Sequence, residues 1–94
     1  MDKVYKQVIK PRSLDKDNMT VIEVPYGSRI LKADSQREDI CIWYRFAEHA
    51  ENNKTKMKIW VIPTGVRFAA SENYLGTVML HNGSLVFHVF LEFM

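Results

Sequence analysis

Turn-forming residues cut the chain into short segments, and this spacing constrains its fold more than any other feature. Segments rich in β-branched and aromatic side chains alternate with clusters of Gly, Pro, Asn and Asp. No segment has the length and period of a long helix. The seven expected strands cover residues 4–10, 19–24, 28–33, 40–47, 57–62, 74–80 and 84–93.

This pattern predicts an all-β antiparallel fold, either a small sandwich or a partly open barrel of about seven strands. One short helical turn at most is expected, at residues 48–52, and residues 66–73 are expected to be irregular. The length of 94 residues favours a single domain over residues 1–94. The hydrophobic fraction of 47% and the charged fraction of 26% are typical of a soluble globular protein.

The last two strands carry the clearest hairpin signal. Asn82-Gly83 lies between two apolar segments, and both residue types tolerate a positive φ. The pair therefore predicts a two-residue type I′ turn.

Alternation along three strands predicts one core face and one mixed face in each. The core faces are expected to carry Ile40, Ile42, Tyr44 and Phe46, then Met57, Ile59 and Val61, then Leu85, Phe87, Val89, Leu91 and Phe93. The opposite faces combine aromatic side chains with Arg45, Lys58 or His88. A partly apolar second face needs a cover. The other sheet, a second subunit or a ligand could each supply it.

The residue types give little support for catalysis. Three histidines and one cysteine show no metal-ligand spacing, so no metal and no cofactor are expected. Cys41 lies in an apolar strand and is expected to be a buried small hydrophobe. Adjacent carboxylates fall in polar turns, and there is no phosphate-binding glycine loop. The chain is therefore expected not to be an enzyme.

A local basic and aromatic surface is expected around the fifth strand. Lys54, Lys56, Lys58 and Arg67 flank Trp60 with no acidic residue between them. Such a surface suits stacked bases and phosphates. The alternative is a solvated lysine strand that guards a sheet edge. The formal net charge of +2 gives no strong signal for nucleic-acid binding.

His88 has two interpretations. Its ring is either hydrogen-bonded within the sheet or part of a ligand-contacting surface, since an imidazole beside aromatic side chains suits a polar, anionic ligand.

The N-terminus and the apolar segments bear on localisation. Basic residues interrupt the N-terminus, and no apolar run reaches the length of a membrane span, so no membrane association is expected and the cytoplasm is the expected compartment.

Several short motifs together resemble a family of small bacteriophage proteins with no assigned function. The motifs are an opening Val-Tyr-Lys strand, a Pro-x-Gly turn, a Cys-x-Trp strand, and Gly-Thr followed by a hairpin and Leu-Val-Phe-His-Val-Phe. The matching residues are Val4, Tyr5, Lys6, Pro25, Gly27, Cys41, Trp43, Gly76, Thr77 and residues 85–90. The family's Gly-Thr-Gly-His-like turn is replaced here by residues 63–66, Pro-Thr-Gly-Val. The resemblance implies a phage origin and a host-cytoplasm setting, and it supplies no catalytic residue.

These features lead to a hypothesis of a non-enzymatic phage accessory protein that acts by binding. The leading version is an anti-defence protein that sequesters a cyclic or other nucleotide immune signal as a homo-oligomer. The expected roles are stacking, phosphate contact and hydrogen bonding, from Trp43, Trp60, Arg45, Lys58, Thr64 and His88. The alternative is a protein–protein interaction module that inhibits a host protein or serves phage particle assembly.

Overall fold

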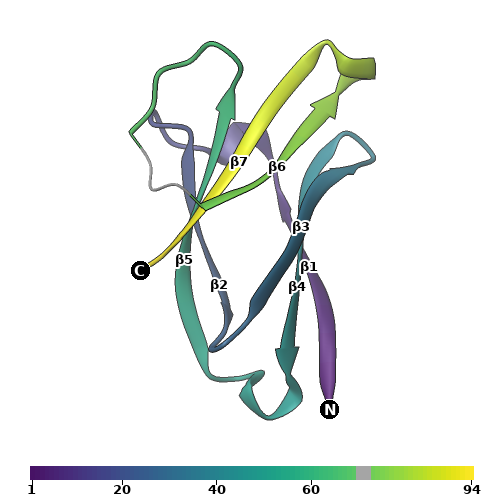
Figure 1. Cartoon of the computed structure of the whole chain (residues 1–94), viewed down its shortest axis with the longest axis vertical. Coiled ribbons are helices and arrows are strands. Elements are labelled where there is room, and N and C mark those ends of the chain that lie inside the picture. Colours follow the sequence, from purple (N-terminus) through teal and green to yellow (C-terminus); the bar gives the residue numbers. More distant parts are fainter. Residues whose placement is uncertain (70–72) are drawn as a thin grey trace.

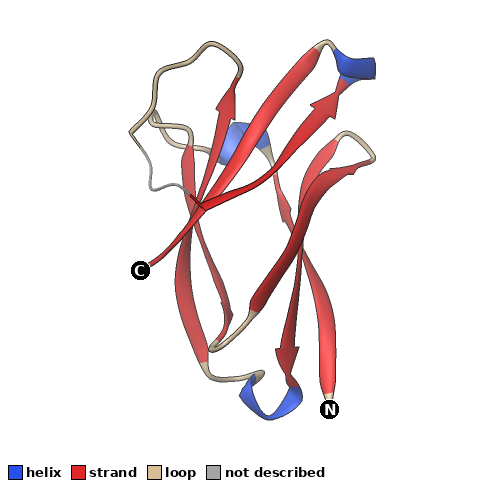
Figure 2. Ribbon diagram, viewed as in Figure 1, coloured by secondary structure: helices blue, strands red, loops and turns tan. Residues whose placement is uncertain are grey.

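Seven strands form two antiparallel sheets that are not closed into a barrel (Figures 1 and 2). The computed structural model describes residues 1–69 and 73–94. The strands are β1 (Asp2–Ile9), β2 (Met19–Pro25), β3 (Arg29–Gln36), β4 (Asp39–Ala47), β5 (Lys54–Pro63), β6 (Asn73–Leu80) and β7 (Leu85–Phe93). The three-stranded sheet has the order β1-β4-β3, and the four-stranded sheet has the order β2-β5-β7-β6. The predicted all-β class is confirmed, and the sandwich is the correct one of its two forms.

Three short 3-10 helices connect strands, namely η1 (Pro11–Ser13), η2 (Glu48–Ala50) and η3 (His81–Gly83). The helix η2 is the helical turn that the sequence predicted, and η1 and η3 are two more than the single turn expected. Among the described residues, none of these turns has the length or the apolar run that a membrane-spanning helix needs. Residues 66–69 are irregular, as expected, and residues 70–72 of that predicted segment lie outside the described residues.

Two strands extend by three residues beyond one of their predicted ends. The strand β5 begins at Lys54 rather than at residue 57, because Lys54 and Lys56 pair with Pro25 and Glu23 of β2. The strand β3 continues to Gln36 and meets β4 through a turn at Arg37-Glu38, both with positive φ. These polar extensions bury no apolar face, so the hydrophobic pattern that marks a strand is absent from them.

The turn at Asn82-Gly83 is confirmed. Both residues have a positive φ, 57° and 88°, and the N–H of Ser84 donates to the carbonyl oxygen of His81 at 3.1 Å. These are the marks of a type I′ turn. His81 also has a positive φ of 52°, so the ladder closes one pair further on, at Leu80 and Leu85.

The core lies between the two sheets and receives side chains from every strand. All core-face residues predicted for β4 and β5 are buried, and Met57, Ile59 and Val61 are 0% exposed. In β7, Val89 and Leu91 are buried and Phe87 packs against the core. Leu85 and Phe93 are 42% and 53% exposed because they lie at the two ends of the strand. Alternation therefore identifies the inward face of β7 correctly, and only the residues at the two ends of the strand are exposed.

The two sheets come closest where β3 lies against β6. Each of these strands has a register irregularity, between Ile30 and Lys32 in β3 and between Tyr74 and Gly76 in β6. Such bulges bend and twist a strand. Gly76 permits the close approach, since a Cβ there would lie 3.3 Å from the carbonyl oxygen of Ala33.

We expect Gly76→Ala to destabilise the protein by about 1–2 kcal/mol, because the added methyl meets backbone that can move only with its strand. Chemical denaturation monitored by circular dichroism measures this. Met79→Ala is the control on the same strand, where the side chain is 59% exposed and a change within about 0.5 kcal/mol is expected. An unchanged or increased stability of Gly76→Ala would show that β3 and β6 are further apart than described.

A polar cluster holds β1 to the loop between β4 and β5. Glu51 accepts hydrogen bonds from Lys3 Nζ and from Tyr5 Oη, each at 2.9 Å. The hydrogen bond from Lys3, then that from Tyr5, lowers the pKa of Glu51 below its usual value of 4.5. A carboxyl group with a lowered pKa stabilises the folded state above its usual pKa, and that contribution is lost as the pH falls through the folded-state value.

Stability should therefore fall on acidification below about pH 4.5, and Glu51→Gln should make part of that fall disappear. Thermal melting of both proteins between neutral and acidic pH tests this. Glu23→Gln, on the outward face of β2, is the control and should keep the full acid dependence. Identical pH profiles for Glu51→Gln and the unaltered protein would contradict the assignment.

Candidate functional site

The six side chains expected to contact a ligand lie on two opposite outer faces of the sandwich. Lys58 and Trp60 of β5, His88 of β7, and Thr64 just after β5 belong to the outer face of the four-stranded sheet. Trp43 and Arg45 alternate with buried residues of β4, so they lie on the outer face of the three-stranded sheet. Within one chain the six residues therefore do not lie together, because β4 and β5 belong to different sheets and their mixed faces point in opposite directions.

An apolar row crosses the outer face of the four-stranded sheet. Strand register aligns Met19, Trp60, Phe90 and Tyr74, one residue from each strand. The rings of Tyr74 and Phe90 meet edge to face at 5.6 Å, and the ring of Phe68 lies 5.0 Å from that of Phe90. These contacts make the row the aromatic centre of this face.

The segment 64–69 covers part of this face. Ile62 points outward from β5 and yet is only 1% exposed, and Phe68 packs on Phe90. The suggestion that the second sheet covers the mixed faces of β4, β5 and β7 is wrong, because that sheet covers only their core faces. For β5 and β7 the cover is instead supplied by the chain's own loop after β5, and it is incomplete.

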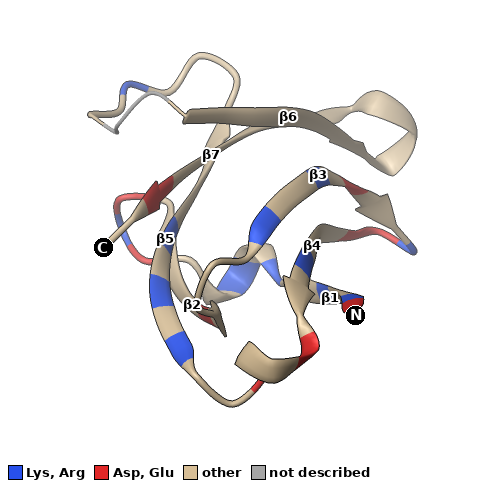
Figure 3. Ribbon diagram, turned by 60° about the horizontal axis from the view of Figure 1, so that its bottom comes forward, with Lys and Arg blue, Asp and Glu red and all other residues tan. Residues whose placement is uncertain are grey.

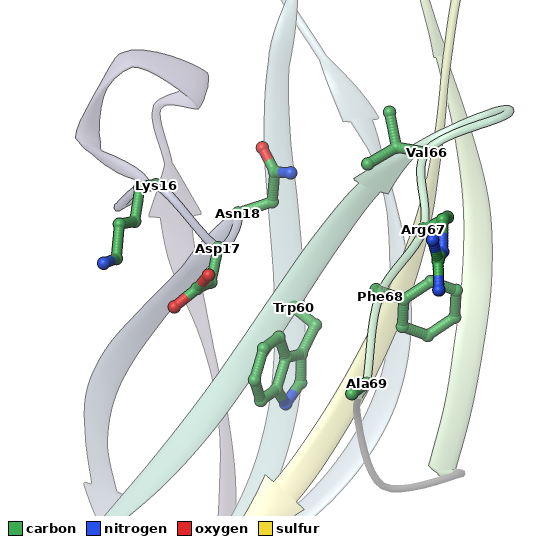
Figure 4. Close-up of a pocket in the computed structure, with 8 residues that line it drawn as sticks. All are labelled: Lys16, Asp17, Asn18, Trp60, Val66, Arg67, Phe68 and Ala69. Atoms are coloured by element: carbon green, nitrogen blue, oxygen red, sulfur yellow. The ribbon is translucent and has the colours of Figure 1, made fainter.

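A cavity of ≈ 330 Å³ lies between this loop and the turn before β2, with the indole of Trp60 standing between them (Figure 4). We call it the Trp60 pocket. Its lining residues are Lys16, Asp17, Asn18, Trp60, Val66, Arg67, Phe68 and Ala69. The two walls each carry one cation, Lys16 and Arg67, and the pocket also holds one carboxylate and one amide. Such a composition suits a planar ligand with negative charge.

One wall of the Trp60 pocket is a tight turn organised by Asp15. Its Oδ1 accepts the backbone N–H of Asp17 at 2.8 Å and that of Met19 at 3.1 Å. Asn18 has a φ of 61°, and its carbonyl oxygen accepts the N–H of Val61 at 2.9 Å. The turn is thus attached to β5 beside Trp60, which places Lys16 and Asp17 at the pocket.

The other wall begins at the turn of residues 63–66, which His88 holds in place. Gly65 has a φ of 89°, and the N–H of Val66 donates to the carbonyl oxygen of Pro63 at 3.2 Å. Thr64 Oγ1 lies 2.8 Å from His88 Nε2, and Thr77 Oγ1 lies 3.1 Å from His88 Nδ1. Both ring nitrogens are therefore hydrogen-bonded within the chain. His88 acts as an anchor for the loop that covers the sheet.

The indole N–H of Trp60 is buried without a hydrogen-bond acceptor among the described residues. An unsatisfied buried donor costs about 1–3 kcal/mol. A phenylalanine at this position would avoid this cost.

Figure 3 shows basic residues at intervals along β5, and their alternation with the buried Met57 and Ile59 places them on its outward side. In register, Lys56 faces Glu23 of β2 and Lys58 faces Glu92 of β7. The interpretation of β5 as an edge strand guarded by lysines is wrong, since β5 lies between β2 and β7. Lys58 lies one outward position from Trp60 but does not line the Trp60 pocket.

Trp43 and Arg45 have charged neighbours of their own. Lys32 Nζ lies 6.0 Å from the centre of the Trp43 ring, and Arg45 Nε donates to Asp2 Oδ2 at 2.7 Å. Cys41, on the same face, is 1% exposed, and burial raises its thiol pKa. This confirms that Cys41 is a buried small side chain. Residues 1–69 and 73–94 contain no group of three or more His, Cys, Asp or Glu side chains that could hold a metal ion.

The match to a domain family covers residues 1–93 and carries the description "domain of unknown function". The chain belongs to the DUF7352 family. No curated protein and no solved structure matches it. The expected membership of a family without assigned function is thus confirmed, while a phage origin of this DUF7352 protein stays a prediction.

Sequence reasoning missed most of the Trp60 pocket of this DUF7352 domain. The sequence pattern places Arg67 in a basic surface and Phe68 in an irregular segment, but it gives no signal that Lys16, Asp17 and Asn18 lie beside them. A turn at residues 15–18 could be predicted from Asp15, because aspartate side chains often accept hydrogen bonds from the backbone N–H groups that follow them. Its position beside Trp60 depends on the pairing of β2 with β5, which no local signal specifies.

We expect Trp60→Phe to change stability by less than about 1 kcal/mol, because the loss of buried area is offset by removal of the unsatisfied donor. Trp60→Ala should cost about 2 kcal/mol or more, since it removes the ring from the aromatic row. Urea denaturation of both variants measures the difference. Equal losses in the two variants would mean that the N–H group contributes a hydrogen bond.

Proposed function

We propose that this DUF7352 protein is a non-enzymatic binding protein that takes a small nucleotide in the Trp60 pocket. The observation that carries the proposal is the position of the Trp60 indole between two walls that each present one cation, Lys16 and Arg67. A base has a planar π surface and a phosphate has negative charge, and the pocket offers a counterpart for each.

The lining residues divide naturally into three roles. Trp60 is the stacking platform, and Phe68 closes the apolar side. Lys16 and Arg67 take phosphate oxygens, with the planar Arg67 suited to a bidentate contact. Asp17 and Asn18 provide acceptors and an amide donor for the polar edge of a base.

The biological role we propose is sequestration of a nucleotide immune signal, cyclic or linear, by a phage anti-defence protein acting as a homo-oligomer in the host cytoplasm. Two features support this role: the sequence resemblance to small phage proteins and the presence of the Trp60 pocket. Sequestration needs only affinity and no catalytic group, which agrees with the absence of a recognisable acid–base constellation in the sequence.

A second candidate is a protein–protein interaction module that inhibits a host protein or serves particle assembly. It is favoured by apolar side chains at the margin of the same face. Val21, Tyr74 and Met79 are 43%, 59% and 59% exposed. Val21 lies on the edge strand β2, and Tyr74 and Met79 lie on the opposite edge strand β6. Exposed apolar side chains at both edges of one face suit a macromolecular surface better than a small ligand.

Isothermal titration against mononucleotides and cyclic oligonucleotides tests the leading proposal. Loss of a stacked base costs about 1–3 kcal/mol, so Trp60→Ala should weaken binding roughly 5- to 150-fold. Arg67→Gln lies on an exposed segment and should weaken binding and flatten its salt dependence without disturbing the fold.

Lys54→Gln is the matched control, because Lys54 is an exposed cation of β5 outside the pocket. Its affinity should equal that of the unaltered protein. The nucleotide proposal fails if no ligand in the panel gives heat with the folded protein, or if Lys54→Gln weakens binding as much as Arg67→Gln. A stable protein complex recovered in a pull-down, together with no nucleotide heat, would favour the second candidate.

A further inference from the structure

Two arginines face each other across the outer surface of the three-stranded sheet. Arg29 of β3 and Arg45 of β4 are register partners, so their side chains leave the same face from directly opposed positions. Like charges placed directly opposite on neighbouring strands destabilise a sheet. A compensating negative charge would therefore stabilise the pair.

The chain supplies only part of that charge. Asp2 Oδ2 accepts the Nε–H of Arg45 at 2.7 Å, which leaves the two terminal nitrogens of that guanidinium for other acceptors. Arg29 is exposed and forms no ion pair with any residue in the part of the chain that the structure describes. Two guanidinium groups and one carboxylate thus leave one positive charge uncompensated.

A cavity of ≈ 320 Å³ lies at this pair. Asp2, Gly27, Arg29, Arg45, Phe46 and Ala47 line it. The turn before β3 brings Gly27 to its rim, with a φ of 81° and the N–H of Ser28 bonded to the carbonyl oxygen of Pro25 at 3.0 Å. The cavity is large enough for a small oxyanion and holds both arginines.

We propose that Arg29 and Arg45 form a binding site for a phosphate group, either inorganic phosphate or the phosphate of a small ester. Each guanidinium fork can bind two oxygens. A phosphate group has at least three oxygens to share between two forks, whereas a carboxylate has only two. Asp2 holds Arg45 in place and leaves its terminal nitrogens directed to the ligand.

This site is separate from the Trp60 pocket and does not depend on the function proposed for it. It lies on the other sheet, and the two cavities share no lining residue. Failure of one proposal therefore leaves the other standing.

Thermal melting in inorganic phosphate, in methyl phosphate, and in chloride of equal ionic strength tests the proposal. Either phosphate probe should raise the melting temperature of the unaltered protein above the value in chloride, because a bound ion stabilises the folded state. Arg29→Gln should abolish that gain. Without phosphate, Arg29→Gln should itself raise the melting temperature, by about 1–5 °C, since it removes the repulsion between the arginines.

Arg12→Gln is the matched control, an exposed arginine in η1 that should keep the full phosphate-dependent gain. A gain that Arg29→Gln removes supports the site, and the probe with the larger gain identifies free phosphate or an ester as its source. Equal melting temperatures in phosphate and in chloride, or a phosphate-dependent gain that persists in Arg29→Gln, would overturn the proposal.

Discussion

The alternation of β5 between a dry face and an outward face is the constraint on which the rest of the structure depends. Met57, Ile59 and Val61 are 0% exposed in the core between the sheets. A shift of register by one residue would bring Lys58 and Trp60 into that core and expose the three apolar side chains. Core packing therefore determines the position of Trp60. It places a large aromatic ring on the outer face of a two-layer protein.

The loop after β5 covers part of this outer face and forms a partial third layer. With only two sheets, the outward apolar row of the four-stranded sheet has no regular element to cover it. The turn at residues 63–66 leads the chain back over the sheet, and Phe68 reaches the ring of Phe90 at 5.0 Å. His88 links the loop to the sheet, because one ring nitrogen is hydrogen-bonded to Thr64 in the loop and the other to Thr77 in β6. The histidine in an apolar strand is thus explained by a structural role that also shapes the wall of the Trp60 pocket.

The parts of the fold that local chemistry determines could be predicted from the sequence. Inward faces follow from alternation, and the turn at Asn82-Gly83 follows from the backbone freedom of its residues. What could not be predicted is which strands share a sheet. Trp43 and Trp60 lie on different faces because β4 and β5 are consecutive strands that belong to different sheets. The same limit concealed Asp17 and Asn18, which reach Trp60 only through the pairing of β2 with β5.

Because the outward side chains are divided between two faces, the small net charge of the whole chain does not describe the charge at either face. A formal charge of +2 gives little reason to expect an anionic ligand when it is averaged over the chain. On the outer face of the three-stranded sheet, however, Arg29 and Arg45 lie opposite each other, and Asp2 of the neighbouring β1 is bonded to Arg45 and not to Arg29. In the Trp60 pocket, Lys16 and Arg67 outnumber Asp17. Interactions of charges near a surface are strong only within about 10 Å, so a ligand responds to these local groups rather than to the total. A nearly neutral protein can therefore carry two separate cationic sites, one on each sheet.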